Sequence, residues 1–315
     1  MRFEDISISK IQLDNRTCEI SFLSDLTVLR NSIQQKGILQ PVHLKALGTG
    51  RFQVVSGFKR IDCAQALGFT SIPAFILEDE ISLLECFERA VEENFFSRKF
   101  NVIEKAGVIQ KLEKEFNISK EVLIQKYLPF LGLNASETVY QIYKNSVTLD
   151  PFVQEYIVRD HLPVYVIEEF FKFSLPDQRV IILFLQSIHF SVSTLKEFLV
   201  WIYEISLRDR SSISDMLLEP LKAIVQDHTL DGRQKLQVLR QWLKNKRYPR
   251  LSTLETRFVM LKQKLHLPLE ATEFFEDNKL HMKLSFQNKK ELEQWIEKMK
   301  EASLKPELDE ILKIV

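Results

Sequence analysis

Alternation of apolar and polar positions predicts a strand, a turn, a helix and a second strand within residues 53–77. Gln53–Ser56 is a short β-branched run that ends at Gly57. Apolar residues then recur at helical spacing at Ile61, Ala64 and Leu67. We expect Gly68 to end this helix and the apolar run Ile72–Leu77 to form the next strand.

The same patterns predict the elements on either side of this stretch. We expect strands over residues 6–13, Val42–Leu47, Arg51–Ser56, and helices over Leu26–Lys36, Ser82–Asn94, Val102–Phe116. Gly37 is expected to end the first of these helices, and Gly48-Thr49-Gly50 to join two strands as a hairpin. Asn101 with Glu104 three residues later is typical of a capping box.

Helical spacing dominates the rest of the chain. Helices are expected over Ser136–Lys144, Pro151–Arg159, Val164–Phe173, Asp177–Ser187, Ser193–Ile205, Met216–Gln226, Arg233–Lys244, Ser252–His266 and Lys289–Glu301. Pro129–Gly132 is expected to break the pattern, Arg208–Ser214 to be a polar connector, and Ala271–Glu276 and Leu280–Phe286 to be strands around the turn 277–279. Because only 8 Gly and 10 Pro occur in 315 residues, the composition favours a mostly helical α+β chain over an all-β one.

Lys59 and Arg60 follow Gly57 on the first turn of the predicted helix. Free backbone N–H groups and the helix dipole attract anions at such a position. The two cations therefore indicate a phosphate cradle, and a solvated helix start is the equally simple alternative.

The net charge is 0, so only the distribution of charge is informative. Between Arg233 and Lys264 there are ten basic residues and one acid, Glu255, a difference of 10 − 1 = 9. A phosphate-binding face is one interpretation of this run, and a solvated helix face is the other.

Cysteine and histidine positions argue against a disulfide framework or a zinc site. Cys18, Cys63 and Cys86 are widely spaced, and the six His residues have no ligand spacing. The first residues lack the apolar core of a signal peptide, and Val180–Leu185 is far too short to cross a bilayer. A cytoplasmic protein without a membrane partner is expected.

Glu93 and Asn94 place a carboxylate beside an amide near a predicted helix end. Oxygen donors of this kind suit a hard divalent cation that also binds phosphates. Taken alone, the pair is more typical of a solvated helix terminus.

Three stretches resemble the conserved boxes of the ParB N-terminal domain of chromosome and plasmid partition proteins. They are Gly37-Ile-Leu-Gln-Pro-Val, Gly57-Phe-Lys-Arg-Ile-Asp-Cys-Ala, and Glu93-Asn-Phe-Phe-Ser-Arg followed by Asn101-Val-Ile-Glu-Lys-Ala. The resemblance covers roughly residues 3–115 and continues less sharply to about residue 205. It implies a ParB/sulfiredoxin-like fold.

This resemblance also implies that the domain binds CTP and Mg²⁺ and closes a clamp around DNA. The positions that would bind the nucleotide are Gln40, Ser56, Gly57, Lys59, Arg60, Glu93, Asn94 and Arg98, with Glu93 and Asn94 beside the Mg²⁺. Two positions depart from the family pattern: Phe58 replaces the usual acid, and Ser97 stands where the usual Arg falls, with Arg98 one place later. Loss of an acid beside a metal–triphosphate makes nucleotide hydrolysis uncertain. A reductase of the sulfiredoxin type would require a Cys in the Gly57–Arg60 turn, and Cys63 lies further along.

Residues after 116 match the helix-turn-helix region of the family. Its second helix would expose polar side chains to DNA at Asn134, Ser136, Thr138, Gln141 and Lys144, and the later basic run adds Lys246, Arg247 and Arg250. Lys144 is the nearest cation and Glu137 would repel phosphate, so a packed helical hairpin that reads no sequence is the competing interpretation.

We therefore expect a ParB-like domain over 1–115, an all-α helix-turn-helix-type domain over 116–207, a basic helical connector over 208–250 and an αββα unit over 251–315. The last unit would dimerise or pack against the chain's own helices. The leading hypothesis is a nucleotide-responsive, nucleoid-associated DNA clamp in partition or regulation, forming a homodimer and working with a partition ATPase. The alternative is an interaction scaffold that has lost nucleotide switching. A nuclease lacks support because no paired-carboxylate metal site is evident.

Overall fold

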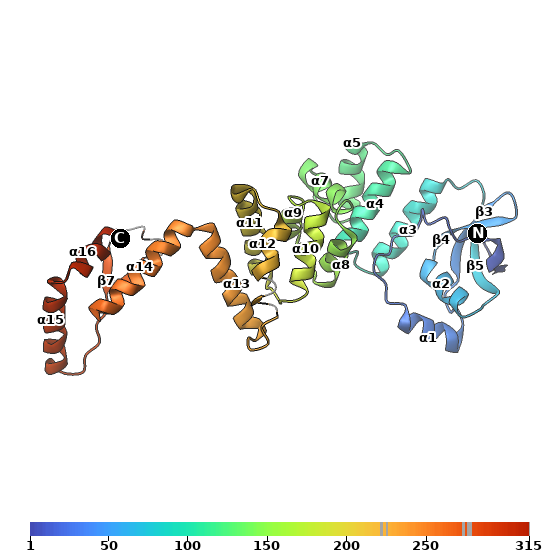
Figure 1. Ribbon diagram of the computed structural model, residues 1–315. Helices are drawn as coiled ribbons and strands as arrows, with labels where there is room; N and C mark the ends of the chain where they lie inside the picture. Colours follow the sequence, from blue (N-terminus) through green and yellow to red (C-terminus); the bar gives the residue numbers. More distant parts are fainter. Residues whose placement is uncertain (221–222, 225, 273–274, 276–278, 315) are drawn as a thin grey trace. The chain divides into compact units, whose positions relative to one another are not determined.

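The computed structural model describes residues 1–220, 223–224, 226–272, 275 and 279–314. The chain forms two compact units, Met1–Leu183 and Phe184–Val315 (Figure 1). The division of the chain into four segments, expected from the sequence, remains a prediction.

The first unit begins with a mixed sheet of five strands. They are β1 (Arg2–Ser7), β2 (Ile11–Gln12), β3 (Val42–Leu47), β4 (Arg51–Ser56) and β5 (Ser71–Leu77), in the order β1-β5-β3-β4-β2. β3 pairs antiparallel with β4 and parallel with β5. The predicted hairpin is therefore confirmed.

A single strand over residues 6–13 is wrong. A 3-10 turn, Ile8–Lys10, separates β1 from β2. β1 pairs with β5 at one edge of the sheet, whereas β2 pairs with β4 at the other edge. Because the two halves of this segment pair with different strands on either side of the 3-10 turn, they do not form one continuous strand.

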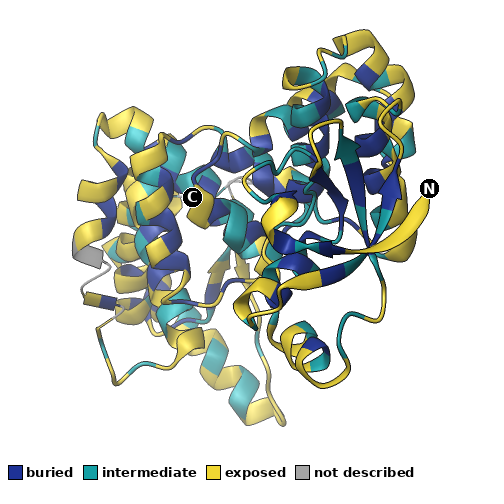
Figure 2. Ribbon diagram, turned by 90° about the vertical axis from the view of Figure 1, so that its right-hand side faces the viewer, coloured by how far each residue is buried: buried dark blue, intermediate teal, exposed yellow. Residues whose placement is uncertain are grey.

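Helices α1 (Thr27–Lys36), α2 (Phe58–Ala66) and α3 (Leu83–Ser97) accompany this sheet. α2 packs against β3, and α3 packs against β4. Central strand residues such as Val42 and Leu44 are fully buried. Figure 2 shows the strands largely in the buried colour and the outer helix turns in the exposed one. Burial of these apolar side chains is the main stabilising contribution to the domain.

The remaining helices of the first unit are α4 (Val102–Lys114), α5 (Lys120–Val122), α6 (Leu128–Phe130), α7 (Glu137–Ser146), α8 (Pro151–Arg159) and α9 (Val164–Phe170). Asn101 and Glu104 form the predicted capping box of α4. A π-helical turn, Leu123–Tyr127, joins α5 to α6. The helical path therefore continues through Pro129 to Phe130, two residues into the predicted break Pro129–Gly132, because the wider turn precedes the proline.

The second unit is built from α11 (Val192–Asp209), α12 (Ile213–Pro220), α13 (Gly232–Arg247) and α14 (Pro249–Leu265), followed by β6 (Leu269–Ala271), β7 (Leu280–Met282), α15 (Lys289–Ser303) and α16 (Pro306–Ile314). α10 (Leu175–Leu185) spans the division between the units. Among the described residues, β6 and β7 pair antiparallel. Parts of three predicted elements lie outside the described residues: 277 and 278 of the turn, 273, 274 and 276 of the strand before it, and 221, 222 and 225 of a helix.

Two predictions in this unit are corrected. The polar connector from Arg208 is wrong at its start, because α11 continues to Asp209 and ends only at Arg210, whose φ is 50°. Arg208 donates to the carbonyl oxygens of Lys246 and Arg247 at 2.8 Å, which stabilises the extra turn. The expected αββα unit also has a further helix, α16, whose fully buried Ile311 belongs to the same apolar cluster as Leu261 of α14.

Candidate nucleotide and metal site

The turn between β4 and α2 is a tight junction that only glycine fits. Gly57 has φ 102° and ψ 19°, and an added Cβ would lie 2.7 Å from Val42 Cγ1. A side chain would therefore be strained and would also collide with β3. The Gly57 carbonyl accepts hydrogen bonds from the Arg60 and Ile61 N–H groups. In the described structure, the N–H groups of Phe58 and Lys59 have no protein acceptor, so they are free for an anion.

Lys59 is a half-buried cation on this turn. Its pKa is lowered, first by burial and then by repulsion from nearby Arg98. No described carboxylate forms an ion pair with its amine. An ammonium group beside free N–H groups, without a bonded acid, is suited to a phosphate.

Arg60 makes a different set of contacts. Its Nη1 donates to the carbonyl oxygens of Gln40 at 2.6 Å and Pro41 at 2.8 Å. Burial lowers its pKa, while Glu93 opposes that shift. Arg60 thus holds the loop before β3 against the start of α2, and it brings the predicted site residue Gln40 to the same turn.

Glu93 lies on α3 and faces β3 and β4. Its Oε2 lies 2.9 Å from Nδ1 of His43, a residue that the sequence did not single out. The hydrogen bond with His43 is the largest cause that lowers the pKa of Glu93, with smaller contributions from Ser56 and Arg60. His43 lies directly opposite Ser56 in the β3–β4 pairing. A polar residue at that position of the predicted hairpin was the sequence signal that could have identified His43 as part of the site.

Asn94 donates its amide nitrogen to the Ala90 carbonyl at 2.8 Å, which leaves its amide oxygen as the group that can face a cation. Carboxylate and amide oxygens from Glu93 and Asn94 fit Mg²⁺, which commonly takes one or two protein ligands and completes its shell with water and phosphate. No three His, Cys, Asp or Glu side chains gather as a metal site in the described part of the chain.

Arg98 is held by neighbouring elements. Its Nη1 donates to Glu104 Oε2 at 2.7 Å, and its guanidinium lies 5.0 Å from the Phe100 ring centroid. The electrostatic effect of Arg98 on Lys59 places both near the α2 start. The positive charge of Arg98 therefore acts on Lys59. Its hydrogen bond to Glu104 joins the end of α3 to the start of α4.

Phe58 points into the core. It is 7% exposed, and the Arg16 guanidinium lies 5.4 Å from its ring centroid. Arg16 is fixed by Asp62, with Nη2 2.8 Å from Oδ1. The side chain that replaces the family's acid is thus a packing residue, whose burial contributes about 1.5–3 kcal/mol.

The predicted DNA-binding residues around α7 are differently engaged. Ser136 caps α7, Gln141 donates to Glu137 at 2.7 Å, and Lys144 donates to Glu113 at 2.7 Å. Asn134 and Thr138 are exposed. The predicted residues therefore lie on or beside α7. Two of them, Gln141 and Lys144, already donate to protein carboxylates.

In the basic run of the second unit, ion pairs neutralise several cations. Arg247 pairs with Glu204 and lies 5.4 Å from the Trp201 ring centroid. Lys246 and Arg250 are exposed. Arg247 is therefore a packed, paired residue, whereas its two predicted companions reach solvent.

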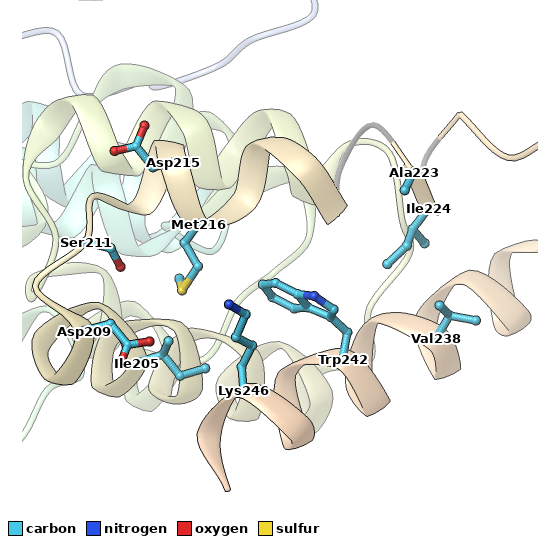
Figure 3. Close-up of a pocket in the computed structure, with 10 residues that line it drawn as sticks. All are labelled: Ile205, Asp209, Ser211, Asp215, Met216, Ala223, Ile224, Val238, Trp242 and Lys246. Carbon is cyan, nitrogen blue, oxygen red and sulfur yellow. The ribbon is translucent and has the colours of Figure 1, made fainter. Parts of the chain in front are cut away.

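A cavity of about 740 Å³ lies between α11, α12 and α13 (Figure 3). Met216, Trp242 and Lys246 extend toward the same space, and Asp209 at its edge accepts two hydrogen bonds from Arg208. Part of the wall is 223–224, which adjoins residues outside the described structure. We assign this cavity no function. None of the described helices is long and apolar enough to cross a membrane.

Comparison with known proteins relates the N-terminal part of the chain to one family. Residues 2–95 match the family model for the ParB N-terminal domain. A probable chromosome-partitioning protein ParB from Neisseria meningitidis is 30% identical over 119 residues, which cover 37% of this chain and 37% of that protein. The chain thus matches little more than a third of that relative's length.

Solved structures of Caulobacter crescentus ParB show lower similarity. The C-terminally truncated protein complexed with CTP-gamma-S is 23% identical, with a TM-score of 0.28, over 56% of this chain and 95% of that one. The form complexed to the centromeric parS site is 22% identical, with a TM-score of 0.35, over 62% and 97%. The family match and the curated relatives therefore show that residues 2–95 form a ParB-like N-terminal domain.

Proposed function

We propose that the N-terminal domain binds a nucleoside triphosphate with Mg²⁺ at the Gly57 turn, and that CTP is its ligand. The observation that carries the proposal is the half-buried Lys59 amine, which forms no described ion pair beside the free N–H groups of Phe58 and Lys59. The choice of CTP follows from the family resemblance. Glu93 and Asn94 would hold the Mg²⁺, which would neutralise charge on the phosphates.

In this proposal the protein is a partition-type DNA clamp. Nucleotide at the Gly57 turn would bring the N-terminal domains of two copies together around DNA, and the α7 region with Lys246 and Arg250 would contact the duplex. A phosphate near Arg60 would compete with the Gln40 and Pro41 carbonyl oxygens for its guanidinium. That competition offers a route from nucleotide binding to movement of the loop before β3.

Calorimetric titration of the full chain with CTP, ATP, GTP and UTP, each with Mg²⁺, tests the binding step. We expect heat with CTP and an affinity at least about 10-fold weaker for Lys59→Ala, because a hydrogen bond to a charged group contributes about 1.5–3 kcal/mol. Lys36→Ala, at the exposed end of α1, is the matched control and should bind as wild type does. Absence of heat with all four nucleotides would contradict the proposal.

Closure on DNA needs a separate measurement. A closed clamp should remain on circular DNA in high salt, which screens phosphate contacts, and should leave linear DNA from its ends. Retention that needs CTP and is abolished by Lys59→Ala supports a switch. Phosphate release measured in parallel determines whether the nucleotide is hydrolysed.

A second candidate is an interaction scaffold without a nucleotide switch. The observation in its favour is that Arg60 and Arg98 already have protein acceptors. Arg60→Ala separates the two functions. The scaffold is supported if neither this substitution nor any nucleotide changes DNA binding or dimer closure.

A further inference from the structure

We infer that His43 is a positioning residue that orients the Glu93 carboxylate for the metal ion of the nucleotide complex. The inference rests on the proposed nucleotide–Mg²⁺ function and adds a residue to it. His43 lies on β3, and Glu93 lies 50 residues later on α3. Their side chains are joined by the 2.9 Å contact between Nδ1 and Oε2. Because a carboxylate accepts hydrogen bonds, Nδ1 carries the proton and donates.

Strand geometry points His43 toward α3. Successive side chains of a strand face opposite sides of the sheet. Val42 packs toward Gly57 at the start of α2, whereas the next residue, His43, reaches Glu93. A register irregularity between His43 and Leu44 interrupts the pairing with β4 at this point. Adjacent residues of β3 therefore reach both parts of the site: Val42 lies against the turn that would hold the phosphates, and His43 holds the acid.

The imidazole is itself held in place. Its centroid lies 5.7 Å from that of Phe75 on β5, with an interplanar angle of 32°. The His43 side chain is 28% exposed, and that of Glu93 is 41% exposed. His43 is thus anchored to the sheet, while Glu93 remains accessible from solvent.

His43 engages Oε2 of Glu93, and the Ser56 hydroxyl is a second hydrogen-bond donor to the same carboxylate. Fixing a glutamate side chain in one orientation costs rotamer entropy. A hydrogen bond that supplies this order before the metal arrives raises metal affinity, and loss of such outer partners typically weakens it by about 10- to 100-fold.

A purely architectural role would give a different result. The same hydrogen bond links α3 to the sheet, so its loss would lower thermal stability. It would not, however, change the Mg²⁺ concentration needed for nucleotide binding by a folded protein. The dependence on Mg²⁺ is therefore the readout that distinguishes positioning from packing.

The test uses the full chain and three variants. His43→Leu removes the donor, and His43→Asn keeps an amide N–H close to the position of Nδ1. Glu92→Gln, at an exposed position beside Glu93, is the control for loss of a nearby charge. CTP binding is measured by calorimetry across a Mg²⁺ titration and again in EDTA, with a thermal melt of each protein.

We expect His43→Leu to raise the Mg²⁺ concentration for half-maximal binding by about 10- to 100-fold while leaving binding in EDTA unchanged. His43→Asn should recover most of this loss, and Glu92→Gln should match wild type. If the Mg²⁺ midpoint of His43→Leu equals that of wild type, the inference about His43 is wrong, while the proposed function stands. Wild-type protein that binds no CTP overturns the proposed function, and the inference with it. If His43→Leu does not fold, His43→Gln, whose longer side chain misplaces the amide, takes its place with the same expectation.

Discussion

Arg98 Nη1 donates to Glu104 Oε2 at 2.7 Å, and this pair joins the end of α3 to the first turn of α4. The Glu104 side chain is only 3% exposed, and it also accepts from the backbone N–H groups of Phe22 and Asn101. Arg98 lies one position after the arginine of the family's third box, and in this structure it forms an ion pair with Glu104.

Arg98→Ala should destabilise the first unit. Its loss leaves a buried carboxylate with backbone donors alone, at a cost of about 1–3 kcal/mol. For a unit of this size we expect the melting temperature to fall by at least about 2 °C. Arg89→Ala, at an exposed position of α3, should change it by much less. Equal melting temperatures for the two variants would contradict this role of the pair.

Gly57→Ala should be more damaging than Gly68→Ala. Both glycines have positive φ, 102° and 77°, so both substitutions strain the backbone. Only at Gly57 does an added Cβ collide with another atom, Val42 Cγ1 at 2.7 Å. Thermal melting should place Gly57→Ala below Gly68→Ala by several degrees. The reverse order would show that backbone strain alone determines the cost.

Glu88 should make stability sensitive to acid. Burial acts to raise its pKa, but hydrogen bonds from Lys126 Nζ and Tyr127 Oη, both at 2.8 Å, outweigh burial, and the pKa lies below the usual 4.5. A carboxyl whose folded pKa is depressed stabilises the protein above its unfolded pKa, and this contribution is lost as pH falls through the folded pKa.

Melting curves of wild type and Glu88→Gln should therefore differ most above pH 4.5 and converge at lower pH. Glu92→Gln, at an exposed position of the same helix, is the control. A stability difference that does not change with pH would refute the ionic contribution of Glu88.

Cys18 should resist alkylation in the native protein. Burial raises the pKa of its thiol to about 12, so almost no thiolate is present at pH 8. Iodoacetamide labelling followed by peptide mass spectrometry should find Cys18 unmodified in buffer and modified in denaturant. Rapid native labelling would mean that this part of the core opens readily.

Arg247 and Arg250 should separate stability from DNA contact. Arg247 pairs with Glu204 and lies against Trp201, so Arg247→Ala should lower the melting temperature. Arg250 is exposed, so Arg250→Ala should leave melting unchanged and weaken salt-dependent binding to duplex DNA, measured by fluorescence anisotropy. Unchanged DNA affinity for Arg250→Ala would remove it from the proposed duplex contact.

Local elements were predictable because their signals are local. β3 and β4 have their predicted bounds, and Asn101 caps α4 as its spacing with Glu104 indicates. Gly57 was recognisable as a turn from its place between a β-branched run and a helical pattern. The short α16 was missed, although Leu308, Ile311 and Leu312 recur at helical spacing in the sequence.

The sequence by itself determined the order of strands and helices in the N-terminal domain from α1 onward, the glycine turn with its two cations and the resemblance to ParB. Only the tertiary structure decided which contacts those two cations make. Arg60 bonds to backbone carbonyls 19 and 20 residues earlier, while Lys59 forms no described ion pair. It also joined His43 to Glu93 across 50 residues. Periodicity and capping depend on neighbours along the chain, whereas hydrogen bonds between side chains depend on which strands and helices pack together.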